Sequence, residues 1–160
     1  MGLPDASDSR LADLTRWVFE DLGFAGGRIE PASADASFRR YFRVTRDEDS
    51  YIVMDAPPEK EGLGPFVSVA RVLLGAGLNV PMILAKDQAR GFLLLSDLGK
   101  RQYLDELDAG TADRLYADAL GALCVMQTAD SGMARDLPLY SHALLMREME
   151  LMPEWFLAGH

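Results

Sequence analysis

Cysteine and histidine are scarce in this chain: Cys124 is the single cysteine, and His142 and His160 are the two histidines. One cysteine cannot form an internal disulfide, and one thiol with two imidazoles is too few for the usual zinc sites. Cys124 lies between Leu123 and Val125 at a helical spacing, so we expect it to be a small core side chain. The sequence therefore predicts no metal site in this chain.

Long apolar runs and a basic charge balance are also missing. No apolar stretch approaches the roughly 20 residues that a bilayer-spanning helix needs, and the polar residues 1–10 contain no apolar signal segment. With 25 acidic and 16 basic side chains, the chain carries a net charge of −9, which disfavours binding to nucleic acid or anionic lipid. These features predict a cytoplasmic protein without a nucleic-acid or membrane partner.

What the chain does have is apolar content, 49% over 160 residues, which is enough for a substantial core. Apolar periodicity and turn residues predict, in chain order, a helix over 11–22, strands over 28–33, 38–46 and 51–56, a helix over 66–74 ended by Gly75 and Gly77, strands over 82–86 and 91–96, and helices over 102–107, over 111–129 and from 141 onward. A small, mainly antiparallel sheet with one intervening helix, followed by helices alone, predicts an α+β fold.

The loop at residues 33–38 is the first candidate for ligand binding. Its small residues let backbone N–H groups approach a ligand, Ser37 adds a hydroxyl, and Arg39 and Arg40 follow as possible phosphate clamps. The loop contains no glycine, however, and a hairpin turn in which Asp35 bonds its own backbone explains the same residues. The spacing alone favours the turn.

The second candidate is the segment at residues 94–99, where a run of leucines enters a polar connector that ends at Gly99. A strand that ends there can leave backbone groups unpaired, and such groups can bind the edge of a flat heterocycle held between two lobes. A strand end without any ligand also explains the segment, and the residues alone favour this reading.

Three stretches resemble the N-terminal half of aminoglycoside phosphotransferase-like kinases, a protein-kinase-like family. They are ADASFRRYFRV at residues 34–44, VMDAPP at 53–58 and GFLLLSDLG at 91–99. Within the family they resemble the bacterial branch that phosphorylates the anomeric hydroxyl of N-acetylmuramate and N-acetylglucosamine in peptidoglycan recycling. The resemblance implies ATP as cofactor, an amino sugar as the other small-molecule partner, and Mg²⁺ held by residues outside this chain.

The resemblance also implies a domain organisation. A kinase small lobe of about five antiparallel strands and one helix is expected at residues 25–97, with residues 1–24 packed on it as an N-terminal helix. Residues 98–160 are expected to form the hinge and the beginning of a truncated helical large lobe.

Four side chains are implied in nucleotide binding by their places in the matching stretches. Ser37 would lie in the loop that covers the phosphates, and Tyr41 would lie above the adenine on the following strand. Val53 would line the adenine pocket and Leu95 would form its back wall.

The backbone of the hinge is implied in recognising the base. The Ser96 carbonyl would accept from the adenine edge, and the Leu98 N–H would donate to it. These contacts would hold ATP without activating the acceptor hydroxyl.

The third strand departs from the family. Kinases place a lysine there that pairs with a helix glutamate, but this chain has Asp55 at that position and no acidic residue at 66–74. A carboxylate facing phosphates would repel them, so we expect Asp55 either to turn away or to reach them through a metal. We hypothesise that Arg40 or Arg43 supplies the missing positive charge.

The catalytic motifs of the family, His-x-Asp with a following Asn and a later Asp-Phe-Gly, do not occur in these 160 residues. We therefore predict no catalytic residue in this chain, and we expect it to be the N-terminal portion of a kinase that is inactive alone. The missing large lobe, or a partner protein, would cover the apolar faces of the last helices. Two alternatives stay open: a kinase for an aminoglycoside, choline or homoserine, and a non-catalytic kinase-like interaction module.

Overall fold

A computed structural model of the chain describes residues 9–34, 37–128 and 140–153. The chain divides into two compact units, residues 1–129 and 130–160, which are treated separately. The first unit contains one β-sheet and most of the helices. In the second, helix α5 (His142–Leu151) begins after Ser141, whose Oγ accepts a hydrogen bond from the Leu144 N–H at 3.2 Å.

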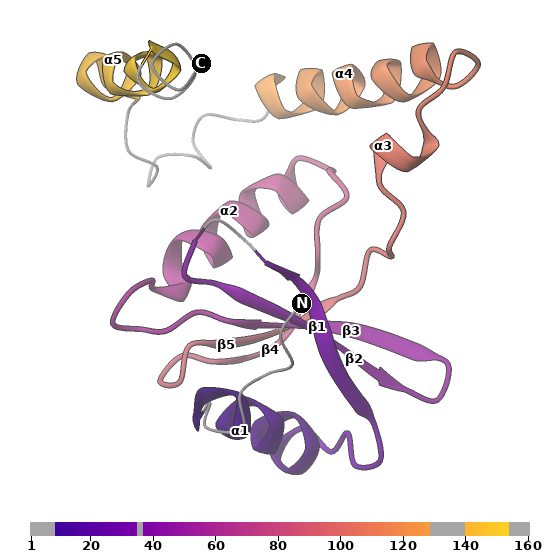
Figure 1. Ribbon diagram of the computed structural model, residues 1–160, viewed down its shortest axis with the longest axis vertical. Coiled ribbons are helices and arrows are strands. Elements are labelled where there is room, and N and C mark those ends of the chain that lie inside the picture. Colours follow the sequence, from indigo (N-terminus) through magenta and orange to yellow (C-terminus); the bar gives the residue numbers. More distant parts are fainter. Residues whose placement is uncertain (1–8, 35–36, 129–139, 154–160) are drawn as a thin grey trace. The chain divides into compact units, whose positions relative to one another are not determined.

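The sheet has five strands: β1 (Arg28–Ala34), β2 (Arg40–Arg46), β3 (Asp49–Asp55), β4 (Ile83–Asp87) and β5 (Phe92–Ser96). Their order across the sheet is β1-β2-β3-β5-β4, and every neighbouring pair is antiparallel (Figure 1). Each edge strand is irregular, β1 between Pro31 and Ser33 and β4 between Ile83 and Ala85. Such bulges make an open edge a poorer template for pairing with another chain.

Helices cover both faces of the sheet (Figure 1). On one face, here called the α1 face, lies α1 (Ser9–Arg16), which continues through a π-helical turn (Trp17–Asp21). On the other, the α2 face, lies α2 (Leu63–Gly75). The sheet and the helices on it confirm the predicted α+β fold.

Strand alternation divides the core between the two faces. The α1 face buries Leu14, Trp17, Val18, Phe24, Phe42, Val44, Val53, Phe92 and Leu94. The α2 face buries Met54, Ala56, Leu63, Leu93 and Leu95. β5 contributes to both lists, because the four residues from Phe92 to Leu95 are all buried, as its unbroken apolar run predicted.

Two local predictions differ from the structure. α2 starts at Leu63, earlier than the predicted Phe66. Gly75, one of the two glycines predicted to end the helix, is its last residue, and only the other, Gly77, has a left-handed φ, +84°. Cys124 is exposed and is not a core side chain. Leu123 and Val125 beside it are exposed too, so this part of the chain packs against none of the described residues closely enough to be buried.

The helices after the sheet are α3 (Tyr103–Glu106) and α4 (Ala112–Thr128), close to the predicted ranges. Leu115 is the one buried residue that the described part of α4 contains. Among the described residues, no helix is long and apolar enough to cross a membrane.

Candidate functional site

A cavity of about 640 Å³ opens on the α2 face at the end of β5. Its walls come from β1, β2, β3, α2 and the connector at residues 96–102. Apolar side chains form much of the lining, including Tyr41, Ile52, Phe66 and Leu95. A pocket of this size with apolar walls and a few polar groups is typical of a small-molecule site.

The structure brings four of the expected nucleotide-binding residues together around this cavity: Tyr41, Leu95, Ser96 and Leu98. Tyr41 and Leu95 share the α2 face, since Tyr41 pairs with Met54 and Leu95 with Ile52 across the sheet. In the described part of the chain, the Leu98 N–H donates to no protein group. The connector therefore offers a backbone donor beside the cavity.

Val53 is not at the cavity. It pairs with Phe42 and Leu94 and is fully buried on the α1 face, on the opposite side of the sheet. Because side chains of a strand alternate between faces, the residue that lines the cavity is its neighbour Ile52. Of the expected nucleotide-binding residues, Val53 thus lies away from this cavity.

The loop before β2 is described only in part, since Asp35 and Ala36 lie outside the described residues. The Ser37 Oγ accepts a hydrogen bond from the Arg39 N–H at 3.1 Å, which folds a tight local turn. Arg39 Nε lies 2.7 Å from Glu61 Oε2, and the Phe38 N–H donates to Glu61 Oε1 at 3.3 Å. Ser37 is exposed and is not among the residues that line the cavity.

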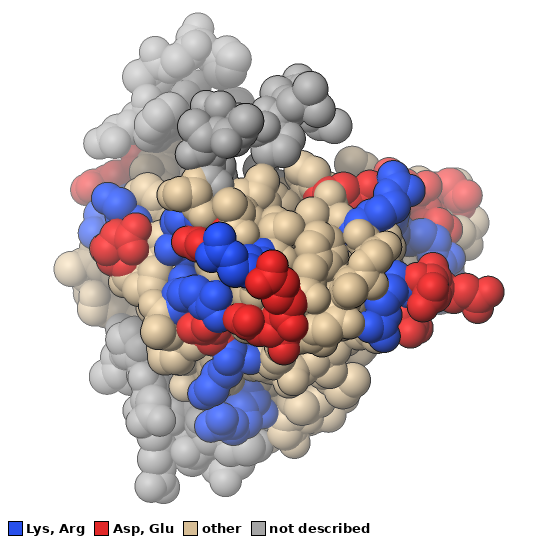
Figure 2. All heavy atoms as spheres, turned by 90° about the horizontal axis from the view of Figure 1, so that it is seen from below, with Lys and Arg blue, Asp and Glu red and all other residues tan. Residues whose placement is uncertain are grey.

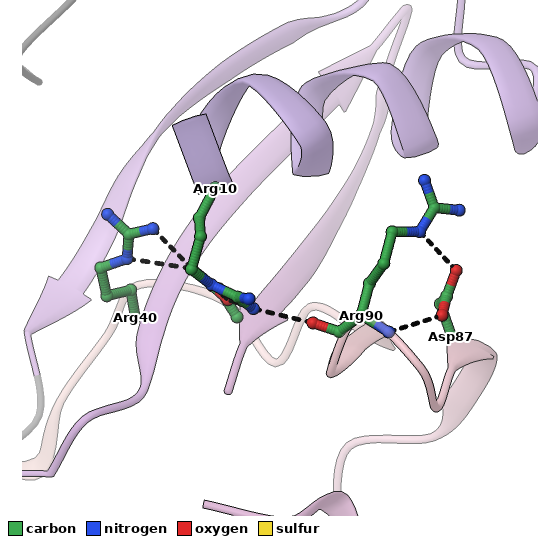
Figure 3. Close-up of polar contacts among 5 residues, drawn as sticks. Arg10, Arg40, Asp87 and Arg90 are labelled. Carbon is green, nitrogen blue, oxygen red and sulfur yellow. Dashed lines mark hydrogen bonds and ion pairs between the residues drawn. The ribbon is translucent and has the colours of Figure 1, made fainter. Parts of the chain in front are cut away.

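Asp55 turns away from the cavity, which agrees with the first of the two expectations for it. Its carboxylate is fully buried on the α1 face between two guanidinium groups. Arg10 Nε donates to Asp55 Oδ1 at 3.0 Å, and its Nη2 bonds the same oxygen. Arg40 Nε and Nη2 donate to Oδ2 at 3.0 and 2.5 Å. In Figure 3, Arg10 at the start of α1 and Arg40 on β2 extend toward the same point.

This ion-pair cluster continues along α1. Arg10 Nη2 also donates to the Arg90 carbonyl at 2.8 Å, and the Arg90 side chain pairs with Asp87 at 2.6 Å (Figure 3). Arg90 Nη2 also pairs with Asp21, at 2.8 Å. Figure 2, viewed from the side of α1, shows basic and acidic side chains interleaved on this surface. The charges compensate one another, so this face presents no broad field of one sign.

All three arginines proposed for phosphate binding are thus engaged with carboxylates, since Arg39 is paired with Glu61. Arg40 is bound to Asp55 on the α1 face. Arg43 lines the cavity, but its Nε and Nη2 donate to the Asp97 carboxylate at 2.6 and 3.1 Å. Hydrogen bonds from Arg43 hold the pKa of Asp97 far below its ordinary value, and the bond to Asp97 raises the pKa of Arg43.

Four residues at the cavity were not predicted from the sequence: Ile52, Asp97, Glu30 and Lys100. Glu30 Oε1 and Lys100 Nζ lie 3.6 Å apart. Strand alternation places Ile52 and Val53 on opposite faces of the sheet, but the sequence does not show which face carries the cavity. Nothing in the sequence pattern links Glu30 to Lys100, because they are 70 positions apart and meet only through the fold. The residues that the structure describes contain no group of three or more His, Cys, Asp or Glu side chains arranged to hold a metal ion.

An antiparallel five-stranded sheet, with a helix on the face that carries the cavity and a connector leading into helices, is the N-terminal lobe of a kinase-like fold. Residues 28–157 match the phosphotransferase enzyme family (APH), and the chain belongs to that family.

Similar proteins carry a more specific name. The chain is 48% identical over 165 aligned residues to the N-acetylmuramate/N-acetylglucosamine kinase of Pseudomonas aeruginosa, covering 97% of this chain and 48% of that protein. It is 46% identical to the kinase of the same name from Pseudomonas putida, covering 93% and 46%. The corresponding protein of Neisseria meningitidis is 39% identical over 79% of this chain and 38% of its own length. The chain thus spans about half the length of the first two relatives, and less of the third.

Proposed function

We propose that this chain forms the nucleotide-binding part of an ATP-dependent kinase that phosphorylates the anomeric hydroxyl of N-acetylmuramate or N-acetylglucosamine. Membership of the phosphotransferase family and the names of its relatives support this reaction. The observation that carries the proposal is the 640 Å³ cavity beside a connector whose Leu98 N–H has no acceptor among the described residues. We expect the protein in the cytoplasm, where ATP is available.

The adenine ring fits the chemistry of this cavity. Tyr41, Ile52 and Leu95 offer apolar surface for the faces of the ring. The Leu98 N–H would donate to a ring nitrogen, and the Ser96 carbonyl would accept from the exocyclic amine. Apolar walls give affinity and a few placed backbone groups give orientation, which is the usual division in such sites.

The phosphates require positive charge or a metal. Mg²⁺ bound to ATP would neutralise the phosphate oxygens. The described residues offer no ligand set for it, so we assign no metal ligand in this chain. The loop around Ser37 remains our candidate for covering the phosphates, whereas Arg40 is bound to the buried Asp55 on the opposite face of the sheet.

The domain organisation follows from the same proposal. We infer that residues 25–97 form the nucleotide-binding lobe and that residues 1–24 include the helix packed on it. Residues 98–160 would form the hinge and the first part of a helical lobe.

The test uses the protein as its gene encodes it, with ATP, MgCl₂ and N-acetylmuramate. We expect ADP to form and a sugar 1-phosphate to appear in the ³¹P NMR spectrum. The methyl glycoside of N-acetylglucosamine lacks the free anomeric hydroxyl and should give no product. Phosphorylation of the methyl glycoside would contradict anomeric transfer, and phosphorylation of an aminoglycoside, choline or homoserine alone would replace the acceptor. No binding or consumption of ATP would favour a non-catalytic interaction module.

A further inference from the structure

Asp97 stands out among the cavity residues because every acceptor position of its carboxylate is used. Oδ2 accepts from Arg43 Nε at 2.6 Å and from Ser50 Oγ at 2.7 Å. Oδ1 accepts from Arg43 Nη2 at 3.1 Å and from the Gly99 N–H at 2.9 Å. Two oxygens with two bonds each satisfy a carboxylate fully. One side chain therefore ties the connector to β2 and to the first half of β3.

The bonds of this cluster hold the far end of the hinge. The Gly99 N–H donates to Asp97, and the Gly99 carbonyl accepts from Arg43 Nη2 at 3.3 Å. Gly99 has a φ of +96°, a conformation that residues with a Cβ rarely adopt. Both polar groups of the Gly99 backbone are thus fixed from the same side-chain pair.

The near end of the hinge is held by Met82, the residue before β4. The Ser96 N–H donates to the Met82 carbonyl at 2.9 Å, and the Met82 N–H donates to Ser96 Oγ at 2.8 Å. Leu98 therefore lies between two anchored residues, and its N–H stays beside the cavity without an acceptor in the described ranges. A donor that is fixed before the ligand arrives loses little conformational entropy on binding.

We propose that Asp97 is a positioning residue for the nucleotide: with Arg43 and Ser50 it locks the hinge so that the Leu98 N–H is directed at the adenine edge. This inference rests on the proposed function, since it assumes that adenine occupies the cavity. Asp97 itself touches no reacting atom and acts through the backbone of residues 98–99.

Asp97→Asn tests the inference, because the amide keeps the volume of the side chain but cannot accept all four bonds. The full-length protein is titrated calorimetrically with adenosine, and steady-state kinetics give separate KM values for ATP and for the sugar. We expect adenosine affinity to fall about tenfold and the KM for ATP to rise by the same factor, the effect of one well-placed hydrogen bond. We expect kcat and the KM for the sugar to stay within about twofold, since the hinge contacts the base alone.

Asp87→Asn is the matched control. Asp87 also accepts from a backbone N–H and from an arginine side chain, both of Arg90, at 2.9 Å and 2.6 Å (Figure 3). It is the last residue of β4 and does not line the cavity. The Asp87→Asn variant should lose only the small amount of thermal stability that a surface ion pair contributes. Its affinity for adenosine should equal that of the wild type.

The outcomes separate the two claims. Adenosine binding that is unchanged in Asp97→Asn overturns the positioning role, and so does an equal loss in Asp87→Asn, because either result assigns Asp97 a structural role only. A wild-type protein that binds no adenosine overturns the proposed function itself.

If Asp97→Asn does not fold, Ser50→Ala removes one of the four bonds, and a loss of adenosine affinity of about twofold to threefold is then expected. Unchanged affinity in that variant overturns the inference as well.

Discussion

Replacing Asp55 by alanine should destabilise the protein more than any other single carboxylate removal among the described residues. The Asp55 side chain has no exposed surface and accepts from two guanidinium groups, Arg10 and Arg40, which reach it from α1 and from β2. Without the carboxylate, both guanidinium groups lose this ion pair, and the bridge through Asp55 between helix and sheet is lost. Removing one partner of a buried ion pair costs about 3–5 kcal/mol.

The expected loss for Asp55→Ala lies at the lower end of that range, about 3 kcal/mol, because water can reach the freed arginines. Arg10 is 29% exposed and Arg40 38%, so both can be partly rehydrated. Asp87→Ala serves as the reference, since it breaks the more exposed pair with Arg90. A pair of that kind contributes up to about 1 kcal/mol. The two variants should therefore differ by about 2 kcal/mol.

The assay is equilibrium unfolding in urea followed by tryptophan fluorescence. Trp17 is a suitable reporter, because it is buried in the α1 face with its ring 5.7 Å from that of Phe92. A free energy of unfolding for Asp55→Ala within about 1 kcal/mol of that for Asp87→Ala would refute the reasoning, since it would mean that the buried cluster contributes no more than a surface pair.

Three further predictions use the same measurements. Gly91→Ala should lower the free energy of unfolding by about 3 kcal/mol or more, because φ is +76° and a Cβ would overlap a backbone carbonyl oxygen. Gly77→Ala should lower it by about 1 kcal/mol, because φ is +84° but the space around the residue is open. Equal losses in the two variants would contradict this prediction. Val53→Ala should lower the free energy of unfolding by about 1–3 kcal/mol and leave ATP affinity unchanged, because Val53 is buried away from the cavity. Ile52→Ala should weaken ATP binding, because Ile52 lines the cavity. Weaker ATP binding in Val53→Ala with unchanged binding in Ile52→Ala would put the nucleotide on the α1 face. The pKa of Asp97 is lower in the folded than in the unfolded protein, so its contribution to stability is complete above about pH 4 and is lost as the pH falls below that value. Urea unfolding between pH 2 and 7 should therefore show a flatter acid limb for Asp97→Asn than for the wild type, and parallel curves would contradict the assignment.

The sheet could be predicted from the sequence because its strands follow simple local rules. Phe42 and Val44 alternate with polar residues and lie on one buried face, as their spacing of two requires. The unbroken apolar run of β5 indicated a strand buried on both sides, and the turn residues 47–48 and 88–90 separate the paired strands. Local periodicity was sufficient for the number, type and approximate bounds of these elements.

The candidate site could be predicted only in part, since it depends on which face of the sheet carries the cavity. Alternation assigns Ile52 and Val53 to opposite faces but does not say which of them meets a ligand. One of the two partners of Asp55 was equally out of reach, because Arg10 lies 45 residues earlier and approaches only after α1 packs on the sheet. The pairing of Arg43 with Asp97 over 54 residues has the same origin. Arg40, the other partner of Asp55, lies opposite it in the hairpin of β2 and β3.

The central claim is that the cavity on the α2 face binds the nucleotide, and mapping backbone amide chemical shifts during an ATP titration of the full-length protein tests it most directly. The account predicts saturable shifts at Tyr41, Ile52 and Leu98 around the cavity, with Arg10 and Val18 in the helical segment on the opposite face unaffected. Shifts that gather on the α1 face and leave Leu98 unchanged would contradict it.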